Sequence, residues 1–181
     1  MRIISGKYKG RMLHPPKNLP VRPTTDFAKE SLFNILNNYI DFDGLKVLDL
    51  FAGTGNITFE FVSRGSTDVT SVDSSYACCE FIKKTIVALE MKDAVRVIKS
   101  DVFTFLNKNL NTYNLIFADP PYDMDPDKFQ SLAESVLSKD MLKPEGWLII
   151  EHGERITFAE HPFFVEHRKY GNVNFSFFQK G

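Results

Sequence analysis

An acid, two prolines and an aromatic residue end one of the most apolar segments of the chain. The run Leu115-Ile116-Phe117-Ala118 is typical of a buried β-strand, and Asp119-Pro120-Pro121-Tyr122 follows it directly. Proline fixes its own φ and disfavours a helical conformation in the preceding residue, so this turn is stiff. The Asp119 carboxylate and nearby carbonyls accept hydrogen bonds, and Tyr122 offers a flat face for stacking. Together they suit a planar ring that carries an amine.

The amine of a nucleobase is a weak nucleophile, because its lone pair is delocalised into the ring. Asp119 and the carbonyl of Pro120 could hold the amine hydrogens and direct the lone pair outward. Taken alone, a tight turn in which Asp119 only bonds the backbone is an equally good interpretation. A second motif is needed to choose between the two.

A glycine turn earlier in the chain supplies that motif. Val47-Leu48-Asp49-Leu50 predicts a strand, Gly53-Thr54-Gly55 a turn, and the residues after it a helix. This is not a dinucleotide fingerprint, because Thr58 stands where that pattern has a third glycine or alanine. Asp49 at the end of the strand favours a ligand with an ammonium group over one with a pyrophosphate.

Two more acids close the next apolar runs. Asp73 follows Val69–Val72, where a carboxylate could bond a ribose diol, and Asp101 follows Val95–Ser100. Combined with the glycine turn, they predict a pocket for a nucleoside-containing cofactor.

The elements that must position these acids alternate along the chain. We expect strands near 46–50, 68–72, 95–99, 114–118 and 146–151, and helices near 55–64, 75–90, 102–108 and 127–138. This order predicts a parallel sheet covered on both faces, with its ligands at the carboxyl ends of the strands. A turn at 143–146 precedes the fifth strand. The segments 163–169 and 172–179 predict a closing antiparallel pair, with phenylalanines as core residues: Phe175, Phe177 and Phe178.

The first residues carry an unusual charge. Residues 1–29 hold seven Lys or Arg against one acid, a net of +6, and the remaining residues have a net of −7. A short hairpin with Lys7, Lys9 and Arg11, followed by a proline-rich connector, predicts contact with a polyanion. A solvated hairpin that only aids solubility is the alternative. A helix capped by Thr25 or Asp26 follows, with an apolar stripe from Phe27 up to Tyr39.

Length and composition exclude several classes of protein. At 181 residues the chain has the length of a single domain, and no segment is apolar enough to span a membrane. The adjacent Cys78 and Cys79 cannot readily form an unstrained disulfide, which predicts a reducing compartment and a packing role. Four scattered histidines match no zinc spacing. We expect a cytoplasmic monomer without metal.

These motifs resemble, in order, those of S-adenosylmethionine-dependent methyltransferases that act on exocyclic amines. The segments Arg2–Arg11 and Arg22–Asn34 narrow the resemblance to the RsmD family, over essentially the whole chain. That family methylates N2 of one guanine of 16S ribosomal RNA, position 966 in the usual numbering. The resemblance implies a Rossmann-like α/β class I fold with a seven-stranded, mostly parallel sheet, in which a basic N-terminal hairpin and connector (1–24) precede the catalytic domain (25–181).

The resemblance also implies roles for single residues. Asp119, Pro120 and Tyr122 would be catalytic. The cofactor would be held by residues of the strand ends and turns, namely Asp49, Phe51, Gly53, Gly55, Asp73, Ser74, Asp101, Val102 and Thr24. The RNA, expected within a small-subunit ribonucleoprotein particle, would be bound by Lys7, Lys9, Arg11, Arg22, Pro121 and Tyr122. For the 22–26 turn, simple helix capping is the alternative to covering the methionine end of the cofactor.

Two other functions stay open at this point. The same quartet would serve an enzyme that methylates DNA adenine or cytosine, or a protein amide. A non-catalytic nucleic-acid-binding module with a vestigial cofactor pocket is the second. The loop Asp123–Asp127 has three acids where the family tends to carry basic residues, and is either an exposed helix start or a contact to a base edge or a basic protein.

Overall fold

A seven-stranded sheet forms the centre of the computed structural model, which describes residues 1–21 and 24–181. The strand order is β3-β2-β1-β4-β5-β7-β6, and β7 runs antiparallel to both of its neighbours. The strands are β1 (Lys46–Leu50), β2 (Asp68–Asp73), β3 (Val95–Lys99), β4 (Tyr113–Ala118), β5 (Leu142–His152), β6 (Phe164–Tyr170) and β7 (Val173–Gln179). The expected α/β sheet with a closing antiparallel pair is therefore confirmed.

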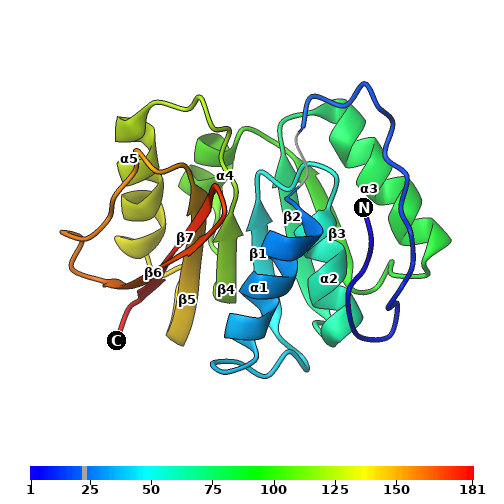
Figure 1. Cartoon of the computed structure of the whole chain (residues 1–181), viewed down its shortest axis with the longest axis horizontal. Helices are drawn as coiled ribbons and strands as arrows, with labels where there is room; N and C mark the ends of the chain where they lie inside the picture. The colour runs from blue at the N-terminus through cyan, green and yellow to red at the C-terminus, as the bar shows by residue number, and fades with distance from the viewer. Residues whose placement is uncertain (22–23) are drawn as a thin grey trace.

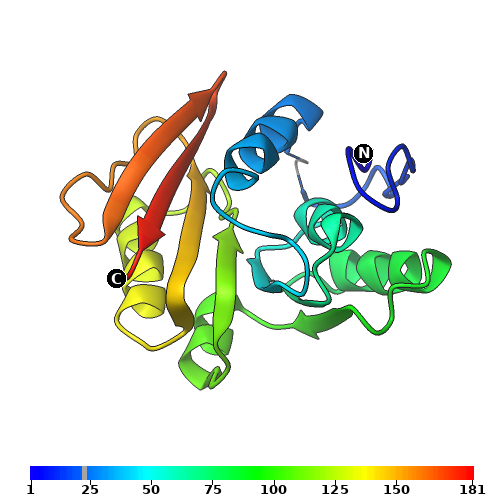
Figure 2. The ribbon, with the colours of Figure 1, turned by 90° about the horizontal axis from the view of Figure 1, so that it is seen from below.

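Five helices cover the two faces of the sheet, as Figures 1 and 2 show. On one face lie α1 (Asp26–Leu36), α2 (Asn56–Arg64) and α3 (Tyr76–Ala88). On the other face lie α4 (Val102–Lys108) and α5 (Pro126–Leu137). Each parallel strand leads through a helix or loop to the next, so the carboxyl ends of β1 to β5 share one edge. We call it the carboxyl edge; it is at the top of Figure 1.

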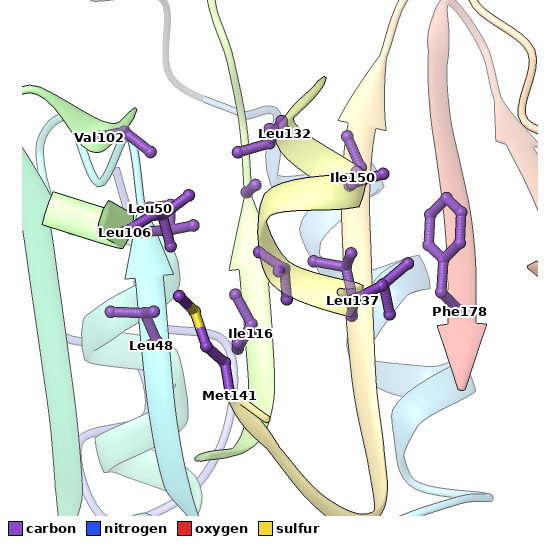
Figure 3. Packing of buried hydrophobic residues seen from close by; sticks show 14 of the residues in the cluster. Leu48, Leu50, Val102, Leu106, Ile116, Leu132, Leu137, Met141, Ile150 and Phe178 are labelled. Carbon is purple, nitrogen blue, oxygen red and sulfur yellow. The ribbon is translucent and has the colours of Figure 1, made fainter. Parts of the chain in front are cut away.

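Side chains alternate between the two faces of the central strands. Leu48 and Leu50 of β1 and Ile116 of β4 pack against α4 and α5, as Figure 3 shows. Val47 and Phe117 point to the opposite face and pack with residues of α1 and α2. This period of two fixes the direction of every acid at the strand ends. The predicted core phenylalanines of β7 are fully buried.

One prediction about the elements is wrong. The expected turn at 143–146 lies inside β5, which begins at Leu142 and accommodates the extra residues by a register shift opposite β4 and a positive φ at Glu145. The apolar stripe of α1 is mostly buried, with Leu32, Phe33 and Leu36 in the core, but its first residue, Phe27, is 64% exposed and lies edge-to-face with the Tyr170 ring. α1 also ends three residues before Tyr39.

The N-terminal arm (residues 1–13) is folded back on itself, but its pairing is shorter than a two-stranded hairpin. A single antiparallel bridge joins Arg2 and Met12. Ile3 is buried in a cluster with Phe59 of α2 and Ile82 of α3. The arm is thus packed onto α2 and α3, and the domain boundary drawn at residue 24 stays a prediction.

A buried ion pair fastens the arm to two helices. Lys29 of α1 and Glu60 of α2 lie 3.2 Å apart, and neither side chain is exposed. Glu60 also accepts bonds from the Ile4 and Ser5 amides at 2.9 and 3.1 Å, and from Arg64 at 2.9 Å. Burial lowers the pKa of Lys29, while Glu60 opposes that shift. Backbone donors and a second cation thus compensate the buried carboxylate.

Both cysteines are buried and free, as a packing role predicts. Within the part of the chain that the structure describes, no helix is both long and apolar enough to traverse a bilayer.

Candidate active site

Three acids lie on one face of the sheet at its carboxyl edge. Leu50 pairs with Ala118, and Ala118 with Ile150, so Asp119 and Glu151 follow directly after paired positions of β4 and β5. Asp49 precedes Leu50 in β1. By the alternation of the strands, all three side chains point to the face covered by α1 and α2. The structure thus brings Asp49 and Asp119 together, as the sequence predicted.

The chain after β1 makes three left-handed residues within five positions. Phe51 has φ 57°, Gly53 has 55° and Gly55 has 77°. A positive φ is costly for a phenylalanine, and such strain gathers at functional sites. A Cβ on Gly55 would lie 2.9 Å from the Phe59 ring and 3.0 Å from Ile82, so this position has no room for a side chain.

Asp73 holds this turn from the end of β2. One of its oxygens accepts the Gly53 amide at 2.8 Å, and the other accepts the Ser75 amide at 2.8 Å. Each carboxylate oxygen has a further lone pair, so Asp73 can still accept bonds from a diol. Ser74 is exposed beside it. α2 then begins at Asn56 without a side-chain cap, which leaves amide donors at its first turn.

Asp49 is almost completely buried and accepts a 2.6 Å bond from the hydroxyl of Thr58 on α2. Burial raises the pKa of Asp49 to about 7, and the bond from Thr58 opposes the shift. The expected contact of Asp49 with an ammonium group stays a prediction. Only 1% of the residue is exposed, and its side chain already bonds Thr58 of the helix that follows the turn.

Glu151 is the site residue that the sequence analysis missed. It is 3% exposed and accepts a 3.3 Å bond from the hydroxyl of Thr24, which comes from the segment before α1. Burial raises the pKa of Glu151 to about 7. Burial raises the pKa of Asp119 well above its usual value, and the charge of Glu151 adds to the shift. A hydrogen bond from Thr24 acts in the opposite direction. The signal was an acid closing the apolar run of β5 in the same manner as Asp119 closes β4.

The rest of the quartet forms the outer rim. Pro120 is buried, Pro121 is exposed and Tyr122 is 56% exposed. The Pro121 carbonyl accepts the Met124 amide at 3.0 Å, which closes the turn. The Tyr122 ring lies over Gly153, since a Cβ there would be 3.5 Å from two ring atoms. Its hydroxyl donates to the Asn172 carbonyl at 3.5 Å. Tyr122 therefore presents an accessible ring at the rim.

Asp101 and Val102 lie at the start of α4. Asp101 is exposed and caps the helix by accepting the Thr104 amide at 2.8 Å. The Val102 side chain is buried in the core, so a ligand could meet only its backbone. In the acidic loop, Asp125 caps α5 by accepting the Asp127 amide at 2.9 Å, as a helix start requires.

The bend of the arm does not lie at the carboxyl edge, although Arg2 at the start of the arm pairs with Asp26 of α1 at 3.5 Å. Lys7, Lys9 and Arg11 are exposed, as phosphate contacts require. However, the Lys7 amide donates to the Ser63 carbonyl at 2.7 Å, near the end of α2 that is remote from the glycine turn. Figure 1 shows this bend of the arm at the opposite edge of the sheet. Arg22 lies outside the described residues.

Comparison with known proteins supplies the family. The family model described as conserved hypothetical protein 95 matches residues 1–179. The chain is 33% identical over 151 residues to ribosomal RNA small subunit methyltransferase D of Escherichia coli, covering 83% of this chain and 71% of that one. The chain belongs to the RsmD family of methyltransferases.

One further relative and one solved structure agree with this assignment. The YlbH protein of Bacillus subtilis is 35% identical over 163 residues, 88% of this chain and 86% of its own. The solved structure of YhhF from Escherichia coli superposes with a TM-score of 0.86 at 27% identity, covering 99% of this chain and 97% of that one. The RsmD resemblance and the Rossmann-like methyltransferase fold that the sequence predicted are therefore confirmed.

Proposed function

We propose that this protein transfers the methyl group of S-adenosylmethionine to the exocyclic N2 amine of a guanine in 16S ribosomal RNA, the guanine-966 type of reaction. The observation that carries the proposal is the position of Asp119 in the stiff quartet, beside the glycine turn and next to Glu151. Membership of the RsmD family supports rRNA as the substrate.

The residues present fit the proposed cofactor. Asp73 retains lone pairs for the two ribose hydroxyls, and the uncapped start of α2 offers amides to the methionine carboxylate. The Val102 backbone and the exposed Ser74 and Asp101 border the adenine side. When bound, S-adenosylmethionine supplies an electrophilic methyl group on a sulfonium centre.

The residues of the chain bind the guanine, orient its amine and exclude water from the site. Tyr122 stacks on a guanine that has left its helix, and Asp119 and the Pro120 carbonyl accept the hydrogens of N2 so that its lone pair faces the methyl group. Positioning contributes most of the rate, since alignment of reactants can supply about 7–11 kcal/mol. We further propose a cytoplasmic monomer that acts on an assembling small-subunit particle, with the arm on RNA phosphates.

Methyl transfer to purified small ribosomal subunits and to their naked RNA tests the proposal, with labelled S-adenosylmethionine and nucleoside analysis. We expect N2-methylguanosine as the product. Asp119→Ala should lose about 100-fold or more of the turnover, because an orienting contact is removed, and should bind S-adenosylmethionine normally. The exposed Asp140→Ala is the matched control and should be fully active.

Methylated adenine, cytosine or protein amide in the same assay would support the alternative targets. No binding of S-adenosylmethionine by calorimetry would support a non-catalytic module. Undiminished turnover in Asp119→Ala would contradict the orienting role of that carboxylate.

A further inference from the structure

Glu151 lies beside the proposed catalytic acid but has no task in the methyl transfer described above. Ile150 of β5 pairs with Ala118 of β4. Glu151 is the next residue after Ile150, and Asp119 is the next residue after Ala118. The two carboxyl groups are therefore neighbours across β4 and β5 on the same face of the sheet. Glu151 is 3% exposed, and a strand buried this deeply would ordinarily end in an apolar residue.

Few hydrogen-bond donors of the described residues reach this pair of carboxyl groups. Two carboxyl groups have four oxygens, and Thr24 has a single hydroxyl hydrogen to share between them. Among residues 1–21 and 24–181, no other hydrogen-bond donor reaches the Glu151 side chain. Lone pairs of both carboxyl groups therefore stay available to donors from a ligand.

Guanine offers matching donors. Its Watson–Crick edge carries the N1–H next to the N2 amine, so two adjacent carboxyl groups can each accept a hydrogen. Adenine instead presents the N1 lone pair at this place, which a carboxylate repels. Base-modifying enzymes that flip out a nucleotide read this edge by such bonds. Two neighbouring acceptors thus fit guanine and reject adenine.

We infer that Glu151 selects guanine by accepting a hydrogen bond from N1–H, while Asp119 accepts a hydrogen of the N2 amine. The inference rests on the proposed function, because it assumes N2 of guanine as the methyl acceptor. Glu151 is a specificity residue, Asp119 orients the nucleophile, and Thr24 holds the Glu151 carboxylate in place.

The test uses an RNA fragment in which 2,6-diaminopurine replaces the target guanine, once that guanine has been mapped. This base keeps the 2-amine but has a lone pair at N1 in place of N1–H. The native protein should methylate guanine with a kcat/KM about 10- to 100-fold above that for diaminopurine, as expected for one hydrogen bond to a charged acceptor. In Glu151→Gln the amide can donate to N1 of diaminopurine, so the ratio should fall toward one or below.

Three controls separate this role from a structural one. Glu151→Asp keeps the charge and should keep a guanine preference at a reduced rate. Glu154→Gln changes an exposed acid three residues away and should leave both substrates unaffected. Binding of S-adenosylmethionine to Glu151→Gln, followed by calorimetry, should match that of the native protein.

Several outcomes would overturn the inference. One is native protein that methylates both bases equally well, and this measurement does not depend on any variant folding. Another is an equal loss of activity on both bases in Glu151→Gln, and a third is loss of cofactor binding in that variant. Failure of the proposed function would look different, because the native protein would then methylate N2 of neither base.

Discussion

The buried acids of the carboxyl edge destabilise the fold that carries them. Burial raises the pKa of Asp49 and of Glu151 to about 7 and that of Asp119 well above its usual value. A carboxyl group whose pKa is raised by folding stabilises the protein at low pH, where it is protonated in both states. That contribution is lost as the pH rises through the folded-state pKa. The free energy of unfolding should therefore fall between about pH 4 and pH 7, and functional sites commonly carry such costs.

Asp49→Asn should remove part of this pH dependence. The amide keeps an acceptor for the Thr58 hydroxyl but carries no charge. We expect the variant to be more stable than the native protein by about 3–4 kcal/mol at pH 8 but by only about 1–2 kcal/mol at pH 5, where the folded carboxyl group is protonated. Urea denaturation at both pH values measures the difference. The exposed Asp43→Asn is the control, and a stability gap in Asp49→Asn that is the same at pH 5 and pH 8 would contradict the assignment.

Single residues of the site were predictable where they belong to a local pattern. Asp119 and Tyr122 stand in one short motif, and Gly53 and Gly55 in another, so their chemistry could be read from neighbouring residues. Glu151 closes an apolar run as Asp119 does, but no local motif marks it, and its partner Thr24 lies 127 residues away in the chain. Only the pairing of β4 with β5 makes Glu151 a neighbour of Asp119.

Among the elements, α1 and α2 connect the arm to the site through a short set of bonds. Lys29 donates to Asn56 at 2.8 Å, and Asn56 donates to the Thr24 carbonyl at 3.2 Å. Thr24 in turn bonds Glu151. The buried Lys29–Glu60 pair therefore supports both the arm and Thr24, which bonds Glu151.

Glu60→Ala should destabilise the protein by about 3–5 kcal/mol, because Lys29 would be left buried without its partner. The Ile4 and Ser5 amides, which donate to Glu60, should also lose protection from hydrogen exchange. Glu80→Ala on α3 breaks an exposed pair with Lys83 and should cost less than about 1 kcal/mol. Equal, small effects in the two variants would show that the buried pair does not fasten the arm.

The elements themselves were largely predictable from their apolar periodicity. The bounds of β1, β3 and α4 agree with the prediction. β5 was predicted too short, since Pro144 and Gly146 indicate a turn and the sequence does not reveal the irregular pairing with β4 that accommodates them. The arm pairs through one bridge, because packing of Ile3 on α2 and α3 fixes it instead.

At the scale of the whole molecule, the basic bend of the arm and the carboxyl edge are separated. The arm bends near the end of α2 that is remote from the glycine turn (Figure 1), and α2 has nine residues, about 13 Å of helix. An RNA that contacts both must extend along this side of the protein. The sequence could predict the charge of the arm but not its distance from Tyr122, since the reversal of the arm depends on tertiary packing.

Replacing Lys7, Lys9 and Arg11 together by glutamine should weaken RNA binding at all sites alike. Each lost phosphate contact should reduce the log-log salt slope of binding by about 0.7–0.9, so the slope should become less steep by about 2 to 3. Titrations over a range of salt concentrations measure it, with S-adenosylmethionine affinity expected to stay normal. Lys108→Gln with Lys128→Gln, on the opposite face, is the control. An unchanged slope in the arm variant would exclude the arm from RNA binding.

Mass mapping of modified nucleosides in small-subunit RNA, from cells with and without this protein, tests most directly whether it methylates a guanine amine. One N2-methylguanosine should disappear when the protein is absent, return with the native chain and stay absent with Asp119→Ala. An identical set of modified guanosines in both kinds of cell would contradict the proposed activity.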